Sequence, residues 1–155
     1  MFNLNQSSKK AQMGENVVVI SDDFSVKSKI LVTVDSRALP RVYDYLVKEG
    51  CLAEGQKTEF LSIFDNILFA KTDGKINWLS VNVKNGYPNW ERLRALFQEL
   101  GVDMDKTTNY EFVARFFSGV GGKAPDLKPC GRENRNDLNE FKEGLRRTII
   151  GDTII

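Results

Sequence analysis

The 155-residue chain is 41% hydrophobic and 28% charged, a composition typical of a globular protein and unlike that of a disordered or membrane-spanning one. The net charge of +1 argues against a protein that binds nucleic acid by bulk charge alone, although it leaves room for a local basic face. Histidine is absent, which excludes histidine-based catalytic triads, histidine general bases and most zinc and iron sites.

The N-terminus is polar and aperiodic, which predicts a flexible tail over residues 1–15 and a single domain over residues 16–155. The tail lacks the apolar core of a signal peptide, and no apolar run approaches the roughly 20 residues that a membrane span needs. Cys51 and Cys130 are far apart and lack CxxC spacing, so we expect both to be reduced thiols. These features predict a cytoplasmic protein with no membrane partner.

Two β-branched runs near the N-terminus, residues 16–21 (NVVVIS) and 29–35 (KILVTVD), predict a β-hairpin. A helix is expected to follow, capped by Ser36 and ended by Gly50, with Pro40 in its first turn, where the missing N–H costs nothing. The apolar spacing of this helix predicts a buried face made of Leu39, Val42, Tyr43 and Leu46.

A second helix and a second hairpin are predicted next. Thr58 can begin the helix, and residues 67–79 then give two apolar runs around a Thr-Asp-Gly turn, which is a strong hairpin signal. The order helix, turn, helix, hairpin over residues 36–79 is that of a winged helix-turn-helix. The inward face of the second helix is expected to hold Phe60, Leu61 and Phe64.

Residues 90–100 form the most regular amphipathic stretch of the chain. Asn89 can cap this helix through its side-chain oxygen, and Gly101 can end it in the left-handed conformation. One face of the helix is expected to carry Trp90, Leu93, Leu96, Phe97 and Leu100.

Two further helices are predicted in the C-terminal third. Thr107 or Thr108 can cap the first, whose many aromatic residues should be buried, and the glycines at 119–122 break the chain after it. A loop over 123–135 then leads to a last helix over 136–150, with Leu138, Phe141, Leu145 and Ile149 on one face. Together the elements predict a helix-dominated α+β fold with one or two β-hairpins.

Two sets of basic residues are candidates for DNA contact. Lys71 and Lys75 flank the tip of the second hairpin, where a winged helix can touch phosphate, but the carboxylates of the preceding helix would repel it. The same helix and hairpin can therefore simply pack the core. The other set is a basic face formed by Arg92, Arg94, Lys123, Lys128, Arg132, Arg135, Lys142, Arg146 and Arg147. Interspersed glutamates fit a solvated surface of mixed charge equally well.

No group of residues predicts catalysis, a metal site or a cofactor. The glycines before Lys123 lack the spacing of a phosphate-binding loop, and they fit a helix stop better. Asp103 and Asp105 could hold a hard cation only with further oxygen ligands, so they fit turn and capping roles. We therefore expect a protein that is not an enzyme.

Tyr87 and Trp90 flank Pro88 in the turn before the central helix. Most aromatic residues of the chain have core spacing, but aromatic residues carried by a loop are typical of contact surfaces. The loop at 85–90 is therefore a candidate for binding a protein partner.

Five sequence segments resemble the RteC family of transcriptional regulators, small proteins encoded on conjugative elements. The segments are YDYLVKEGCL (43–52), EFLSIF (59–64), KINWL (75–79), ERLRALFQEL (91–100) and LNEFKEGLRR (138–147). Between the tryptophan and the next helix, this chain has the longer SVNVKNGYPNW in place of the family's short turn. The resemblance implies a cytosolic, helix-rich regulator of a mobile genetic element, with DNA as its partner and no enzymatic activity. The alternative is a protein-interaction module, an adaptor or inhibitor, that uses the 85–90 loop.

Overall fold

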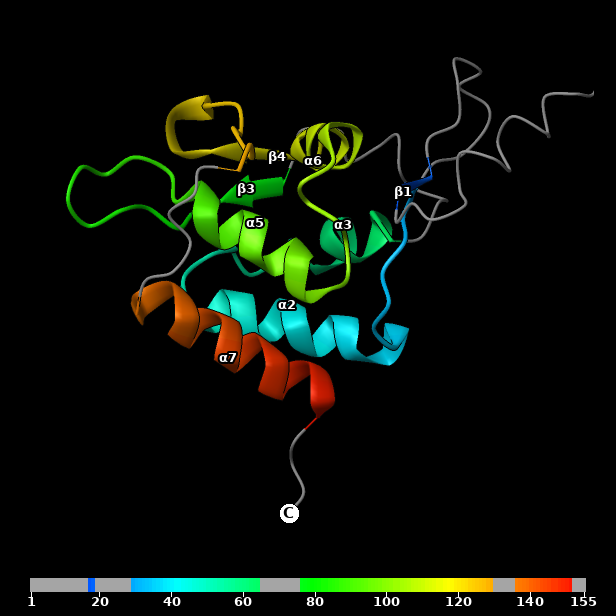
Figure 1. Cartoon of the computed structure of the whole chain (residues 1–155). Coiled ribbons are helices and arrows are strands. Elements are labelled where there is room, and N and C mark those ends of the chain that lie inside the picture. The colour runs from blue at the N-terminus through cyan, green and yellow to red at the C-terminus, as the bar shows by residue number, and fades with distance from the viewer. Residues whose placement is uncertain (1–16, 19–28, 65–75, 130–135, 152–155) are drawn as a thin grey trace, which may run out of the picture.

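The computed structural model describes residues 17–18, 29–64, 76–129 and 136–151, and helices dominate them (Figure 1). This confirms the helix-rich α+β prediction. The helices are η1 (Ser36–Ala38), α2 (Leu39–Lys48), α3 (Lys57–Ser62), α5 (Trp90–Glu99), α6 (Thr107–Ala114), η2 (Val120–Gly122) and α7 (Asn136–Ile150). The strands are β1 (Val17–Val18), β2 (Lys29–Ile30), β3 (Ile76–Trp78) and β4 (Phe117–Gly119). The predicted tail at 1–15 lies outside the described residues.

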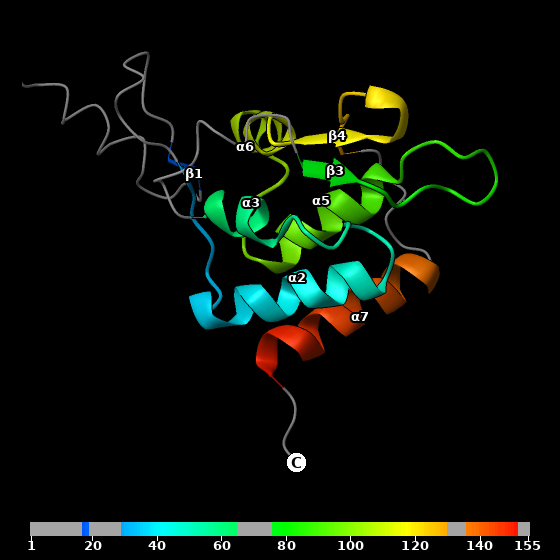
Figure 2. The same cartoon turned by 180° about the vertical axis from the view of Figure 1, so that it is seen from behind.

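Three helices, α2, α5 and α7, form one layer of the structure. Helix α7 packs along both α2 and α5, while β3, β4 and α6 lie beyond α5 on the side away from α7 (Figures 1 and 2). The buried faces of α2 and α5 contain the residues that their spacing predicts, with two differences in α5: Trp90 at its start is half-buried, and Arg94 and Ala95 are buried as well. In α7 the predicted face is buried at Leu138, Phe141 and Leu145 and partly buried at Ile149.

The ends of the central helix follow the sequence prediction. The Asn89 side chain accepts a hydrogen bond of 3.2 Å from the Arg92 backbone N–H, which satisfies one of the free amides of the first turn. Gly101 ends α5 with a φ of 100°, a conformation that side chains with a Cβ rarely adopt.

Two other predicted caps were wrong. Asp35, not Ser36, accepts a hydrogen bond of 2.9 Å from the Arg37 backbone N–H, because the chain enters a short 3₁₀ turn before α2. Helix α6 begins at Thr107 itself and has no side-chain cap, because the preceding Lys106 occupies the cap position.

The small sheets account for the remaining differences. Strands β1 and β2 pair antiparallel, as predicted, but over two residues each, with Val17 opposite Ile30. Strand β3 pairs in parallel with β4, placing Ile76 opposite Phe117 and Trp78 opposite Gly119. The prediction had no strand at β4, because its aromatic residues were assigned to the preceding helix. The turn predicted at 72–74 lies outside the described residues.

Candidate functional site

The predicted DNA-contacting residues divide between described and undescribed parts of the chain. Lys71 and Lys75 lie outside the described residues, whereas Arg146 and Arg147 lie in the last turns of α7. Both ends of the Arg146 guanidinium bind Glu99, with Nε–Oε1 and Nη2–Oε2 distances of 2.8 and 2.9 Å. These hydrogen bonds raise the pKa of Arg146. A phosphate would therefore compete with Glu99 for this guanidinium.

Arg94 does not belong to the predicted basic face, because only 3% of it is exposed. Its guanidinium donates hydrogen bonds to the Met104 carbonyl at 2.5 Å and to the Leu127 carbonyl at 2.9 Å, and it pairs with Asp105 at 2.6 Å. Arg94 thus ties two loops to α5. The helical spacing contained this signal, since Arg94 follows Trp90 by four residues and precedes Phe97 by three.

Residues 79–89, which we call the projecting loop, extend from the body of the molecule between β3 and α5 (green in Figures 1 and 2). Its two arms pair through an antiparallel bridge between Val81 and Pro88. The Asn82 amide donates to the Tyr87 carbonyl and the Asn89 amide donates to the Ser80 carbonyl, both at 2.8 Å. The loop is therefore an ordered hairpin-like element.

The base of the projecting loop is fixed to the core. The indole Nε1 of Trp78 donates a hydrogen bond of 2.9 Å to the Asn89 carbonyl. Gly119 of β4 lies directly beneath the loop, because a Cβ added there would lie 2.5 Å from the Trp90 ring and 2.7 Å from the Pro88 ring. Only a residue without a side chain allows this close approach.

Apolar side chains of the projecting loop face solvent. Val83 at its tip is 99% exposed and Tyr87 is 61% exposed, while Leu79 and Val81 are 40% and 38% exposed. Lys123 lies beside Tyr87, with its ammonium 5.6 Å from the ring centre. The structure thus places Tyr87 on the surface, as expected for a contact residue, whereas Trp90 packs on Gly119 at the loop's base.

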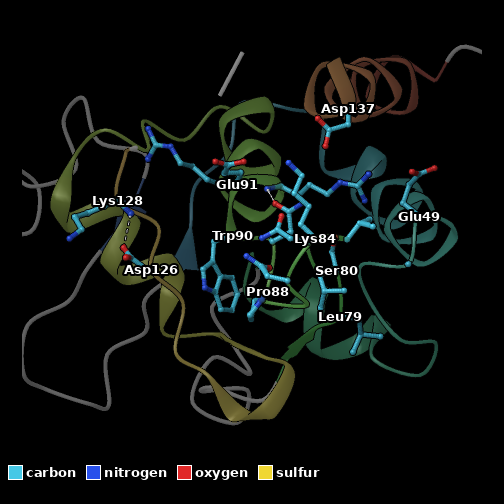
Figure 3. Close-up of a pocket in the computed structure, with 18 of the residues that line it drawn as sticks. Glu49, Leu79, Ser80, Lys84, Pro88, Trp90, Glu91, Asp126, Lys128 and Asp137 are labelled. Carbon is cyan, nitrogen blue, oxygen red and sulfur yellow. Dashed lines mark hydrogen bonds between the residues drawn. The ribbon is translucent and has the colours of Figure 1, made fainter. Parts of the chain in front are cut away.

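A groove of about 1040 Å³ runs beside the projecting loop (Figure 3). Glu49 and Leu79 lie on one side of it, and Asp126 and Lys128 lie on the other. Acidic and basic side chains are mixed along its wall. The charged lining residues are Glu49, Lys84, Glu91, Arg92, Arg94, Asp126, Lys128 and Asp137.

Cys51 follows Glu49 and Gly50, which line this groove, and it is fully buried. Burial raises the pKa of its thiol to about 11, although the Arg92 guanidinium lies 3.8 Å from Sγ and acts in the opposite direction. The thiol is therefore protonated at neutral pH and is a poor nucleophile. Among the described residues, no group of three acidic or cysteine side chains is placed to hold a metal ion.

Comparisons with known protein families, with curated proteins and with solved structures find no match for this chain. The resemblance to the RteC family therefore stays a prediction. None of the helices in the described part of the chain is long and apolar enough to cross a membrane.

Proposed function

We propose that the protein is a protein-interaction module that binds its partner through the projecting loop. The observation that carries this proposal is the exposure of Val83 and Tyr87 at 99% and 61% on an ordered, protruding element. Exposed apolar side chains that gather in one place are typical of interaction sites, whereas single ones are ordinary. Such a protein acts as an adaptor or inhibitor and has no catalytic activity of its own.

The loop has the properties of a preorganised binding element. Its backbone is held by the Asn82–Tyr87 and Asn89–Ser80 hydrogen bonds, so little conformational entropy remains to be lost on binding. Tyr87 offers a large amphipathic ring, which is among the side chains that contribute most at protein interfaces. Lys123 places positive charge beside the Tyr87 ring, and Lys84 adds another in the same loop three residues earlier, which favours a partner with an acidic rim around an apolar pocket.

Site-specific photocrosslinking in the cells that make the protein tests this proposal. A photoreactive phenylalanine derivative replaces Tyr87 in one variant and the exposed Thr108 of α6 in a matched control. We expect a discrete protein adduct from position 87 that is missing at position 108. Identical adduct patterns from the two positions would contradict the proposal, because they would show no preference for the loop.

The second proposal is the DNA-binding regulator of a mobile element that the sequence resemblance implies. It is supported by the order of α2 and α3, which contact each other across a turn containing Gly50 at a φ of 78°. A gel-shift assay at two salt concentrations tests it. Binding that weakens steeply with salt, and that loses about one unit of salt slope in Arg147→Gln, would support it. Equal mobility with and without protein would contradict it.

A further inference from the structure

One edge of the projecting loop continues an edge of strand β3 that the protein itself covers only in part. Along this edge the odd-numbered amides face away from β4. The Asn77 amide donates to the Gln56 side chain at 3.1 Å, and the Leu79 amide donates to the Cys51 carbonyl at 2.8 Å. In an extended chain, the backbone groups of successive residues point to opposite edges. The Val81 amide and carbonyl therefore point to the same edge as the Asn77 and Leu79 amides.

After the Leu79 amide, the protein supplies no further hydrogen-bond partner to this edge within the described residues. Within the described part of the chain, no hydrogen bond is made by the amides of Val81 and Val83 or by the carbonyls of Leu79 and Val81. The other arm is blocked as a pairing edge, because Pro88 has no N–H and packs on Gly119. The open groups therefore lie along one short edge, which is extended at Val81 and enters the turn of the loop tip at Val83, and its side chains at 79, 81 and 83 are apolar and exposed.

We infer that this edge binds the same edge of a second copy of the chain, forming a two-fold symmetric antiparallel strand pair centred on Val81. The two Val81 residues exchange N–H and C=O hydrogen bonds with each other. The Val83 amide of each copy donates to the Leu79 carbonyl of the other. The pairing uses each open group just named, and it does not need the Leu79 amide that Cys51 already occupies.

The side chains and charges suit a second copy. In this register Leu79 lies opposite Val83 of the second copy, so apolar side chains meet along the pair. Lys84 of the second copy then lies at the Leu79 end of the edge. Glu49 lines the same side of the groove as Leu79, and it comes two residues before Cys51, whose carbonyl binds the Leu79 amide (Figure 3). The antiparallel arrangement thus brings opposite charges together, and no charged residue lies within 79–83 to repel its copy.

Sedimentation velocity of the purified full-length chain over a wide range of concentrations tests the inference. We expect a monomer–dimer equilibrium. Val81→Pro removes one open donor per copy and no internal hydrogen bond, so it should raise the dissociation constant about thirty-fold. A wild-type chain that stays monomeric throughout, or a folded Val81→Pro variant that dimerises as well as wild type, would overturn the inference.

Exchanging the charges of Lys84 and Glu49 tests the register of the strand pair without introducing a proline. Lys84→Glu and Glu49→Lys should each weaken the dimer about three- to ten-fold, and the double variant should restore it. Lys48→Glu, a charge change on the exposed face of α2, is the matched control and should have no effect. A double variant weaker than either single variant would overturn the register. Tyr87 lies on the other arm, so Tyr87→Ala should leave the dimer intact. Val83 takes part in both proposals, so the Tyr87 variant is the one that tests the dimer separately from the proposed partner site.

Discussion

The face of α5 and the projecting loop before it contain similar side chains in opposite environments. Leu93 and Phe97 are fully buried, whereas Val83 and Tyr87, a few residues earlier, are 99% and 61% exposed. The helix repeats its apolar residues at a spacing that aligns them on one face, where Phe97 packs against Phe64 and against Phe117 of β4. The loop is held by its own backbone hydrogen bonds and keeps its apolar side chains in water. Hydrophobicity by itself therefore does not separate residues that fold the protein from residues available for binding.

The largest expected effect is in the core. Phe97 packs among aromatic rings, with Phe64 and Phe117 at centroid distances of 6.2 and 5.9 Å. Phe97→Ala should lower the free energy of unfolding by about 3–5 kcal/mol, measured by urea denaturation. Tyr87→Ala is the matched aromatic control in the loop and should cost less than about 0.5 kcal/mol. Equal losses from the two variants would remove the distinction between the two regions.

Arg94 sharpens the comparison because it is a charged residue that belongs to the core. Arg94→Met keeps most of the side-chain volume but leaves the Met104 and Leu127 carbonyls without this donor. We expect a loss of about 2–4 kcal/mol in the free energy of unfolding. The exposed Arg147→Met serves as the control. If both variants retained wild-type stability, Arg94 would have no structural role.

Cys51 is expected to make the free energy of unfolding depend on pH in the alkaline range. Burial raises the pKa of the folded-state thiol to about 11 from an ordinary 9.0. Below pH 9 both states keep the proton, so the contribution to stability is complete. Between pH 9 and 11 the unfolded state loses the proton first, and stability should fall by up to about 2–3 kcal/mol.

The alkaline loss is measured as the free energy of unfolding against pH in a Cys130→Ser background. Adding Cys51→Ala should flatten the curve between pH 9 and 11. Tyr45, whose pKa burial raises to about 12, is present in both proteins, so the part of its contribution that is due to burial cancels in the difference. Parallel curves for the two proteins would contradict the assignment of this loss to Cys51.

Gly119 joins the two regions, because the loop's base packs on it. Gly119→Ala forces a Cβ against the Trp90 and Pro88 rings. We expect a cost of about 1–3 kcal/mol and a change in tryptophan fluorescence as the base of the loop shifts. Ser118→Ala in the same strand is the control. Wild-type stability and fluorescence in the glycine variant would show that the loop is not anchored there.

The sequence predicted the parts of the fold that depend on local periodicity. The faces of α2 and α7 and the cap at Asn89 follow from spacing and side-chain chemistry within one helix. The parallel pairing of β3 with β4 was missed, because it joins segments far apart in the chain and leaves no local pattern. Arg94 was assigned to the surface by its charge, since its partners, the Met104 and Leu127 carbonyls, come from loops that only the fold brings near.

The candidate site was predictable only in part. Tyr87 was picked out by its place beside Pro88, and the structure leaves it exposed. Val83 was not, because an isolated valine in a polar segment has no distinguishing pattern. The edge at Val81 is open because Gln56 and Cys51 accept hydrogen bonds only from the Asn77 and Leu79 amides. This pattern cannot be predicted from the residue types.

The claim that the projecting loop serves binding and not folding is tested most directly by the affinity of the cross-linked partner for a Val83→Ser/Tyr87→Ala double variant. Isothermal titration calorimetry with the purified partner should show affinity lowered by about a hundred-fold or more, because interface anchors of this type each contribute about 2 kcal/mol or more. The thermal unfolding midpoint should stay at the wild-type value. An affinity within about two-fold of wild type in the folded double variant would contradict the account.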